Sequence, residues 1–436
     1  MNTLIFNSKN FRDNAVIQKL YAFSKIHDVE LYLVGGSVRD MLLNRSTADF
    51  DFTLKSETIQ FAKSFAESMS SPFVPLEEQP PTARVIVKTQ QPNNGELCID
   101  FTQFRAKTLI EDLCLRDLTI NAMAIPLVSV METDHPEIID PCNGINNLEE
   151  RQLLFPSEQV ILDDPLRLMR IFRFSAQLDF HIPQKSFRLV QKHSNLLPNV
   201  SPERVRDELF KLLKNKKSNY YLQRMSEADL LPKVIPSLEK SLDSWSSLER
   251  FEKIPIPESL SVYRAEIETY LNEELGLFTN RCSLIKFCLL NTDYSVESGK
   301  HLRLSRKAVK FLKCISTEYP QLSDKVMTKK QIIAFLRDTT SEWWGVLLFS
   351  AVILPIPVGI LKQIAETYYQ HLLPILKRGR LISGEDLIRK FQLKEGREIG
   401  VLLKQIEEMQ HHGEIQTRTE AFTAVEKLIQ KKNKSI

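Results

Sequence analysis

Two aspartates one residue apart follow closely on a pair of glycines near the start of the chain. Gly35 and Gly36 come directly after the apolar run Leu31–Val34, and the acidic pair is Asp49 and Asp51. Glycines at a strand-to-helix turn let the backbone approach a phosphate, which the helix N-terminus attracts. Residues i and i+2 of a strand share a face, and two carboxylates so close favour a bound cation such as Mg²⁺. The pattern predicts a phosphate site beside a magnesium site; the alternative is an ordinary turn and a solvated acidic strand.

Short apolar runs with strand spacing alternate with helical segments up to about residue 141. Phe50 and Phe52 alternate with the two aspartates, which places the phenylalanines in a core. The expected strands are Glu30–Val34, Phe50–Leu54, Ala83–Lys88, Leu97–Phe104 and Asn121–Pro126, with helices at Ser37–Leu43 and Glu57–Met69. After about Leu162 the strand signals stop and helical spacing continues. The expected fold class is therefore α+β, a head with a mixed sheet followed by an all-α remainder.

The composition is that of an ordinary globular protein of 436 residues, with 43% hydrophobic and 26% charged residues. Lys and Arg number 58 against 55 Asp and Glu, so a nucleic-acid surface must come from local segregation of charge. The N-terminal segment lacks a secretory signal, and prolines interrupt the apolar run Trp343–Leu361, so a cytoplasmic protein without a membrane span is expected. The six cysteines are scattered, as reduced thiols would be, and nothing indicates an oligomeric state.

The glycine turn and the acidic pair together resemble the first motif of the class II tRNA nucleotidyltransferase and bacterial poly(A) polymerase family. The resemblance implies a polymerase-β-like catalytic head. It also implies that Asp49 and Asp51 hold Mg²⁺ and act in catalysis. The residues implied in the triphosphate pocket are Gly35, Gly36, Arg39 and Asp40.

Asp100 lies on an alternating strand that could run beside the acidic pair. In polymerase-like heads a third carboxylate of this kind deprotonates the RNA 3′-hydroxyl or helps to hold the metal. Asp100 is therefore a candidate catalytic residue. The alternative is an edge-strand acid paired with Arg105.

The segment Arg116–Ala124 resembles the second motif of the family. Arg116 offers a fork for phosphate, while Asp117 and Asn121 can bond ribose hydroxyls and so favour ribonucleotides. An ion pair with a helix cap would explain the same residues without a nucleotide. Leu115 stands where the family has a further basic residue.

The segment Asp163–Phe174 resembles the fourth motif, which selects the base. Pro165 fits the first turn of a helix capped by an Asp, and Asp164 and Arg167 lie three residues apart on one face. The resemblance implies that this carboxylate and guanidinium read the Watson–Crick edges of CTP and ATP, replacing a template. The alternative is a helix cap with an i,i+3 ion pair. The nucleotide-binding residues implied here are Asp164, Arg167, Arg170 and Arg173.

Looser resemblances extend the match to the end of the chain. Asp140–Leu148 resembles the third motif, a turn that links head and neck, and Ser201–Leu209 resembles the fifth, which braces the neck. The expected domains are a catalytic head over 1–141, a helical neck over 142–230, and a tRNA-binding helical body and tail over 231–436. Basic clusters at Lys211–Lys217, Arg303–Lys313 and Lys431–Lys434 are candidate RNA phosphate contacts or else solvated helix faces.

The implied activity is metal-dependent, template-independent addition or repair of the 3′-terminal C-C-A of tRNA, using CTP and ATP and gripping the acceptor stem and T-arm. A partial enzyme adding only C-C or only A stays open, because the segment between Phe104 and Arg116 is short. Poly(A) polymerase is less favoured, since Pro72–Pro81 replaces the Gly-Arg-Arg-Phe-like stretch of that branch. A non-catalytic helical RNA-binding protein is the alternative from another class.

Overall fold

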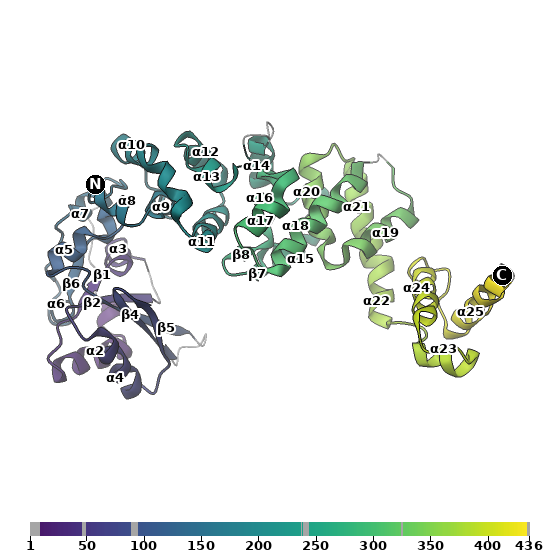
Figure 1. The fold of residues 1–436 in the computed structure, drawn as a ribbon, viewed down its shortest axis with the longest axis horizontal. Coiled ribbons are helices and arrows are strands. Elements are labelled where there is room, and N and C mark those ends of the chain that lie inside the picture. Colours follow the sequence, from purple (N-terminus) through teal and green to yellow (C-terminus); the bar gives the residue numbers. More distant parts are fainter. Residues whose placement is uncertain are drawn as a thin grey trace. The chain divides into compact units, whose positions relative to one another are not determined.

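The computed structural model describes residues 9–45, 49–88, 95–236, 238, 244–323 and 326–433. The chain divides into two compact units, Met1–Pro236 and Ser237–Ile436, which are described separately (Figure 1). Head and neck, expected to meet near residue 141, thus belong to one unit, and their boundary stays a prediction.

A mixed six-stranded sheet, as expected, forms the centre of the first unit, with strand order β3-β4-β5-β2-β1-β6 (Figure 1). Its strands are β1 Tyr32–Val34, β2 Asp49–Leu54, β3 Phe73–Glu78, β4 Pro81–Lys88, β5 Glu96–Gln103 and β6 Ala124–Pro126. Only β2 and β5 pair in parallel among the described strands, and all other neighbours are antiparallel.

The alternation of β2 folds as its sequence predicts. Phe50 and Phe52 are 6% and 0% exposed, whereas Asp49 is exposed and Asp51 half-buried on the other face. Phe52 stacks with Phe101 of β5, their ring centroids 6.0 Å apart. This aromatic layer holds the acidic strand rigidly against the core.

Helices surround this sheet, and the rest of the unit is helical (Figure 1). They are α1 Lys9–Arg12, α2 Ala15–Ile26, α3 Gly36–Leu42, α4 Thr58–Ser68, α5 Leu109–Cys114, α6 Leu127–Glu132, α7 Gly144–Glu149, α8 Gln159–Asp163, α9 Arg167–Leu178, α10 Gln184–His193, α11 Pro202–Leu213, α12 Ser218–Glu227 and α13 Leu231–Val234. Phe23 of α2 and Phe65 of α4 make an edge contact, which joins these two helices beside the strands.

Two strand predictions differ from the structure. β3, which was not expected, is an edge strand with mostly exposed side chains and an internal Pro75, so it lacks an alternating apolar signal. The strand expected at Asn121–Pro126 begins only at Ala124, because Thr119–Asn121 form a 3₁₀ turn.

The second unit is helical apart from one short hairpin, β7 Glu274–Gly276 with β8 Thr279–Asn280, which the sequence did not indicate. Its helices are α14 Ser244–Lys253, α15 Arg264–Asn272, α16 Arg281–Leu290, α17 Ser295–His301, α18 Arg306–Glu318, α19 Lys329–Thr339, α20 Trp343–Ile353, α21 Val358–Glu366, α22 Leu373–Arg378, α23 Gly384–Phe391, α24 Arg397–His411 and α25 Arg418–Asn433.

The first part of the apolar run Trp343–Leu361 forms a buried helix in the second unit. α20 is buried over nearly its whole length and ends before Pro355. None of the described helices combines the length and the apolar character needed to cross a bilayer. All six cysteines are free, and Cys114 and Cys142, distant in sequence, have sulfur atoms 3.3 Å apart.

Candidate active site

A polar cleft of about 710 Å³ gathers most of the predicted site residues in the first unit. It lies where β1 ends and β2 begins, and α9 supplies its opposite wall. The predicted residues that line it are Gly35, Gly36, Arg39, Asp51, Arg116, Asp117, Asn121, Asp164, Arg167, Arg170 and Arg173. Asp40, Asp49 and Asp100 stand directly behind or beside these residues along the same strands and helix.

The glycine turn brings backbone close to both a guanidinium and a carboxylate. Gly35 has φ +66°, a conformation that favours glycine. A Cβ atom placed there would lie 3.4 Å from Arg116 Nη1 and 3.7 Å from Asp51 Oδ2. Because glycine has no side chain, the turn stays open beside Arg116, which could bind a nucleotide phosphate, and beside Asp51, which could bind its metal.

Ser37 ties the start of β2 to the helix that follows the turn. Its hydroxyl accepts a hydrogen bond from Asp51 N at 2.9 Å and donates to the Asp49 carbonyl oxygen at 3.4 Å. α3 and the acidic strand are thereby fixed to each other, which sets the position of both predicted metal ligands.

The carboxyl group of Asp51 lies in surroundings that disfavour its charged form. Burial, together with the neighbouring carboxylates of Asp100 and Asp49, raises its pKa to about 6, although Arg116 and Arg39 oppose the rise. A bound cation would favour the ionised form, so this environment fits a divalent metal. The part of the chain that the structure describes holds no cluster of three or more metal-binding side chains. Asp49 and Asp51, the predicted ligands, lie two residues apart on one face of β2.

Asp100 lies beside the acidic pair, as expected, but it differs from the alternative interpretation in both its strand and its partner. β5 is an interior strand, and Asp100 accepts two hydrogen bonds from Arg84 of β4, at 2.7 and 2.8 Å. The pairing with Arg105 is wrong, because Arg84 is the register partner of Asp100 and Arg105 lies beyond the end of β5. A catalytic role for Asp100 stays a prediction.

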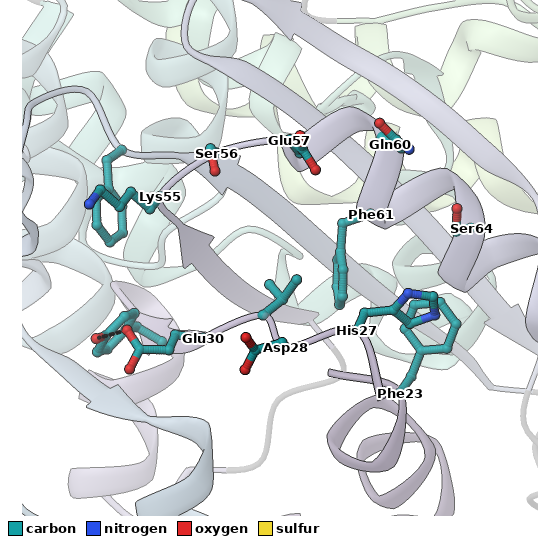
Figure 2. A pocket seen from close by; sticks show the side chains of 13 residues that line it. Phe23, His27, Asp28, Glu30, Lys55, Ser56, Glu57, Gln60, Phe61 and Ser64 are labelled. Carbon is teal, nitrogen blue, oxygen red and sulfur yellow. Dashed lines mark hydrogen bonds between the residues drawn. The ribbon is translucent and has the colours of Figure 1, made fainter. Parts of the chain in front are cut away.

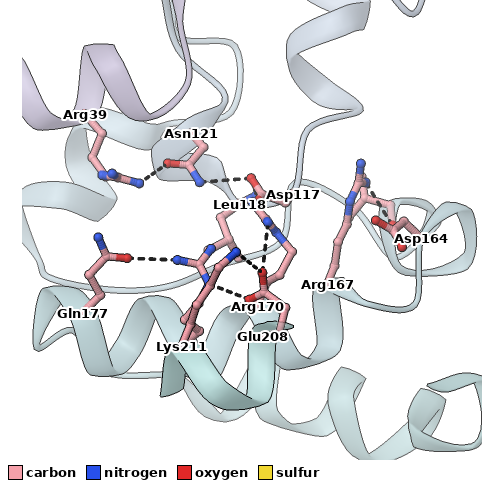
Figure 3. Close-up of polar contacts among 12 residues, drawn as sticks. Arg39, Asp117, Leu118, Asn121, Asp164, Arg167, Arg170, Gln177, Glu208 and Lys211 are labelled. Carbon is pink, nitrogen blue, oxygen red and sulfur yellow. Dashed lines mark hydrogen bonds and ion pairs between the residues drawn. The ribbon is translucent and has the colours of Figure 1, made fainter. Parts of the chain in front are cut away.

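A chain of hydrogen bonds joins the second motif to both α3 and α9 (Figure 3). Arg39 donates to Asn121 Oδ1 at 2.8 Å and pairs with Asp40, and Asn121 donates to Asp117 Oδ1 at 3.0 Å. Arg170 donates twice to Asp117 Oδ2, at 2.9 and 2.6 Å. These bonds lower the pKa of the buried Asp117 well below its ordinary value, against the effect of burial, with Arg170 as the main cause.

The predicted base-selecting pair lies at the start of α9, without the ion pair of the alternative interpretation. The helix begins at Arg167 rather than at Pro165, and Asp164 Oδ1 accepts a hydrogen bond from Leu166 N at 3.3 Å. Arg167 donates to the Val160 carbonyl at 3.0 Å, and Asp164 pairs instead with Arg204 of α11 at 2.9 Å. The i,i+3 ion pair is therefore wrong.

The buried Glu208 of α11 supports the arginines of α9 from behind. It accepts from Arg173 at 2.5 Å and lies 3.5 Å from Arg170. Phe174 packs beneath the Arg173 guanidinium, whose centre is 3.9 Å from the ring centroid. The fourth motif thus presents a braced row of cations to the cleft.

Several cleft residues were not predicted, among them Glu77, Gln79, Thr102, Arg105, Phe174 and Arg204. Glu77 and Gln79 come from β3 and its turn into β4, the strand without a sequence signal. Arg204 lies in the first turn of α11, but its partner is 40 residues away in sequence.

A second hollow of about 670 Å³ lies at the opposite ends of the same strands. Residues that precede β1, such as Asp28 and Glu30, line it together with Lys55 and Glu57 after β2 (Figure 2). Its charged groups are exposed, and none belongs to the predicted site.

Three family models match successive parts of the chain. The poly(A) polymerase head domain matches residues 31–154, a probable RNA- and SrmB-binding site of polymerase A matches 179–242, and a putative tRNA nucleotidyltransferase domain 2 matches 287–425.

Curated relatives match over most of their length. The CC-adding tRNA nucleotidyltransferase of Geobacter sulfurreducens is 30% identical over 89% of this chain and 90% of its own. The CCA-adding enzyme of Lactococcus lactis subsp. cremoris is 27% identical over 93% of this chain and 94% of its own. Among solved structures, the Thermotoga maritima CCA-adding enzyme complexed with tRNA shares the fold, with a TM-score of 0.66 and 23% identity over 96% of this chain and 97% of that one.

Proposed function

Because the chain belongs to the tRNA nucleotidyltransferase family that includes CC-adding and CCA-adding enzymes, we propose that it builds or repairs the 3′-terminal C-C-A of tRNA from CTP and ATP. The observation that carries this proposal is the cleft itself, in which the glycine turn, Asp51 and the start of α9 face one space of about 710 Å³. That space has room for one nucleoside triphosphate and the end of an RNA strand.

The proposed reaction is transfer of a nucleotidyl group to a ribose hydroxyl. The terminal 3′-oxygen of the tRNA forms a bond to the α-phosphorus of the nucleotide, the bond from that phosphorus to the bridging oxygen breaks, and pyrophosphate leaves. Gly35 and Gly36 would accept the triphosphate against open backbone, with Arg39 and Arg116 beside it. Asn121 and Asp117 would bond the ribose hydroxyls.

Asp49 and Asp51 would hold the divalent metal, for which Mg²⁺ is the expected ion. When bound, Mg²⁺ neutralises phosphate charge and favours ionisation of an attacking hydroxyl. The protein's own part is to hold these carboxylates on a strand anchored by Ser37. Asp100 would act on Asp51 as a charged neighbour, because its oxygens are engaged by Arg84.

Asp164 and Arg167 would choose the base. A carboxylate accepts from an exocyclic amine and a guanidinium donates to ring or carbonyl acceptors, so both cytosine and adenine offer complementary edges. Arg167 is held through Val160, and Asp164 through Arg204, which fixes the two groups separately at the cleft wall. Uracil and guanine lack the required amine at that position.

The tRNA itself would be bound by the helical second unit; the Thermotoga neighbour is a complex with tRNA. α18 and the turn before it carry exposed cations suited to RNA phosphates. They are Arg303, Arg306, Lys307, Lys310 and Lys313. In contrast, Lys211 packs near Glu208 and is a poor candidate, and the Lys431–Lys434 cluster lies partly outside the described residues.

A second candidate is addition of the two cytidines alone. The Geobacter relative carries this activity in its name, and the short segment between Phe104 and Arg116 is occupied by α5 with a full capping box at Thr108. A short, capped helix leaves little chain for the longer flexible loop that a change from CTP to ATP would use.

The deciding experiment supplies the purified protein with Mg²⁺ and tRNA lacking C-C-A, tRNA ending in one C, or tRNA ending in two. CTP and ATP are given separately and together. Addition of all three nucleotides supports the first candidate, and arrest after two cytidines supports the second. Growth of homopolymeric tails on unstructured RNA would contradict both, and absence of pyrophosphate release would leave a non-catalytic RNA-binding protein.

A further inference from the structure

A buried carboxylate outside the predicted site holds two of the cleft's guanidinium groups. Asp112 of α5 is fully buried, with a side-chain exposure of 0%. Its Oδ2 accepts from Arg116 Nε at 3.3 Å and Nη2 at 3.0 Å. Its Oδ1 accepts from the Arg105 backbone N at 2.9 Å and Arg105 Nη1 at 3.4 Å.

The two arginines share one negative charge, which leaves an excess of positive charge at that place. Two other cations of the cleft each have a carboxylate partner, since Arg39 pairs with Asp40 and Arg204 with Asp164. Burial and the nearby Arg116 lower the pKa of Arg105, which is the mark of a cation that lacks full compensation. A multiply charged anion at this position would relieve the repulsion.

The position of this pair points to phosphate. Arg116 Nη1 would lie only 3.4 Å from a Cβ atom placed on Gly35, so one guanidinium borders the open glycine turn. Arg105 lines the same cleft. Leu115, at the position where the related motif carries a further basic residue, provides no charge, and Arg105 supplies one from a different segment.

We propose that Arg105 and Arg116 form a two-guanidinium clamp for the phosphates of the incoming nucleotide, and that Asp112 is the positioning residue that holds both. This inference rests on the proposed function, because it assigns phosphate recognition within the same cleft. Planar guanidinium groups give two-pronged hydrogen bonds to phosphate oxygens, and a shared buried carboxylate fixes their spacing before the nucleotide arrives. Arg105 is thus a further nucleotide-binding residue.

The test compares Arg105→Ala and Asp112→Asn with the unchanged protein and with Arg188→Ala, which removes an exposed arginine from α10. Binding of CTP, sodium pyrophosphate and cytidine to the full chain is measured by calorimetry with Mg²⁺ present, and KM for CTP is separated from kcat. We expect both cleft variants to weaken CTP and pyrophosphate binding about 10-fold or more, with KM raised by a similar factor. Cytidine binding and Arg188→Ala should be unaffected.

Two results would overturn the clamp. One is Arg105→Ala binding CTP and pyrophosphate as tightly as the unchanged protein, and the other is cytidine binding falling in parallel with CTP binding. Should Asp112→Asn fail to fold, Arg105→Ala decides alone, and Arg105→Lys should recover only part of the loss because it keeps the charge without the fork. If the unchanged protein adds nothing to tRNA yet shows this binding pattern, the proposed function fails and the clamp stands.

Discussion

Asp51 and Asp100 are register partners on the parallel strands β2 and β5, so their side chains leave the same face of the sheet. Asp51 carries a raised pKa in part because of this neighbour, whereas Asp100 is held by two hydrogen bonds from Arg84. The two carboxylates are adjacent but differ in their surroundings and hydrogen bonds. Substituting one or the other should therefore change nucleotide incorporation to different extents.

Replacing Asp100 with Asn should reduce nucleotide incorporation by less than about 10-fold. A general base contributes roughly 100- to 10,000-fold, and a carboxylate already occupied by Arg84 is poorly placed for that part. The measurement is kcat for CMP addition to tRNA lacking C-C-A. A loss of more than about 100-fold would show that Asp100 takes the proton of the 3′-hydroxyl.

Replacing Arg167 with Ala should impair base choice more than RNA binding. The discrimination carried by one good base contact is about 1–3 kcal/mol, so incorporation of UMP or GMP relative to CMP should rise roughly 10- to 100-fold. The ratio of kcat/KM values measures this, with tRNA affinity as the internal control. An unchanged ratio with weakened tRNA binding would remove Arg167 from the base-selecting site.

Replacing Asp117 with Asn should destabilise the first unit by about 2 kcal/mol or more at neutral pH, because Arg170 loses its charged partner. The pKa of Asp117 is lowered in the folded state, so its stabilisation is full above the unfolded value of 3.8 and is lost as the pH falls further. The stability difference between the two proteins should therefore shrink on acidification from about pH 5 downwards.

Urea unfolding followed at several pH values measures that difference. Asp28→Asn, which removes an exposed acid, should unfold like the unchanged protein throughout. A gap between Asp117→Asn and the unchanged protein that stays constant down to pH 3 would mean that the carboxylate charge contributes nothing.

Replacing Gly144 with Ala should destabilise the first unit by about 1–3 kcal/mol through overpacking. A Cβ atom there would lie 2.4 Å from the Thr119 carbonyl oxygen, and backbone cannot yield easily. Gly359→Ala is the matched control, since a Cβ atom at that helical position meets nothing within 4 Å. Thermal unfolding should show a lowered Tm for Gly144→Ala only; equal Tm values for both variants would contradict the close packing.

The strands that carry chemistry could be predicted because they are buried on one face and polar on the other. β2 alternates Asp with Phe, and Gly35 and Gly36 mark a turn at which Gly35 has a positive φ. β3 gave no such signal, since an exposed edge strand needs no apolar face and here contains Pro75.

The hydrogen-bond and ion-pair partners of the site residues could not be predicted from the sequence. The alternative interpretations paired residues that are near in the chain, Asp164 with Arg167 and Asp100 with Arg105. In the structure the partners are Arg204 and Arg84. Such partners depend on which strands and helices become neighbours, and that is a property of the whole fold. Asp112 was not predicted because a buried carboxylate inside a short helix has no sequence spacing that marks it.

Incorporation of labelled CMP into tRNA lacking C-C-A, compared between the unchanged protein and Asp51→Asn across a Mg²⁺ titration, tests the central assignment most directly. Loss of a metal-binding carboxylate should reduce kcat at least ~100-fold at saturating CTP, while folding and tRNA affinity stay the same. Asp49→Asn should show the same loss. Incorporation at the unchanged rate by either variant, or activity that does not depend on a divalent ion, would contradict it.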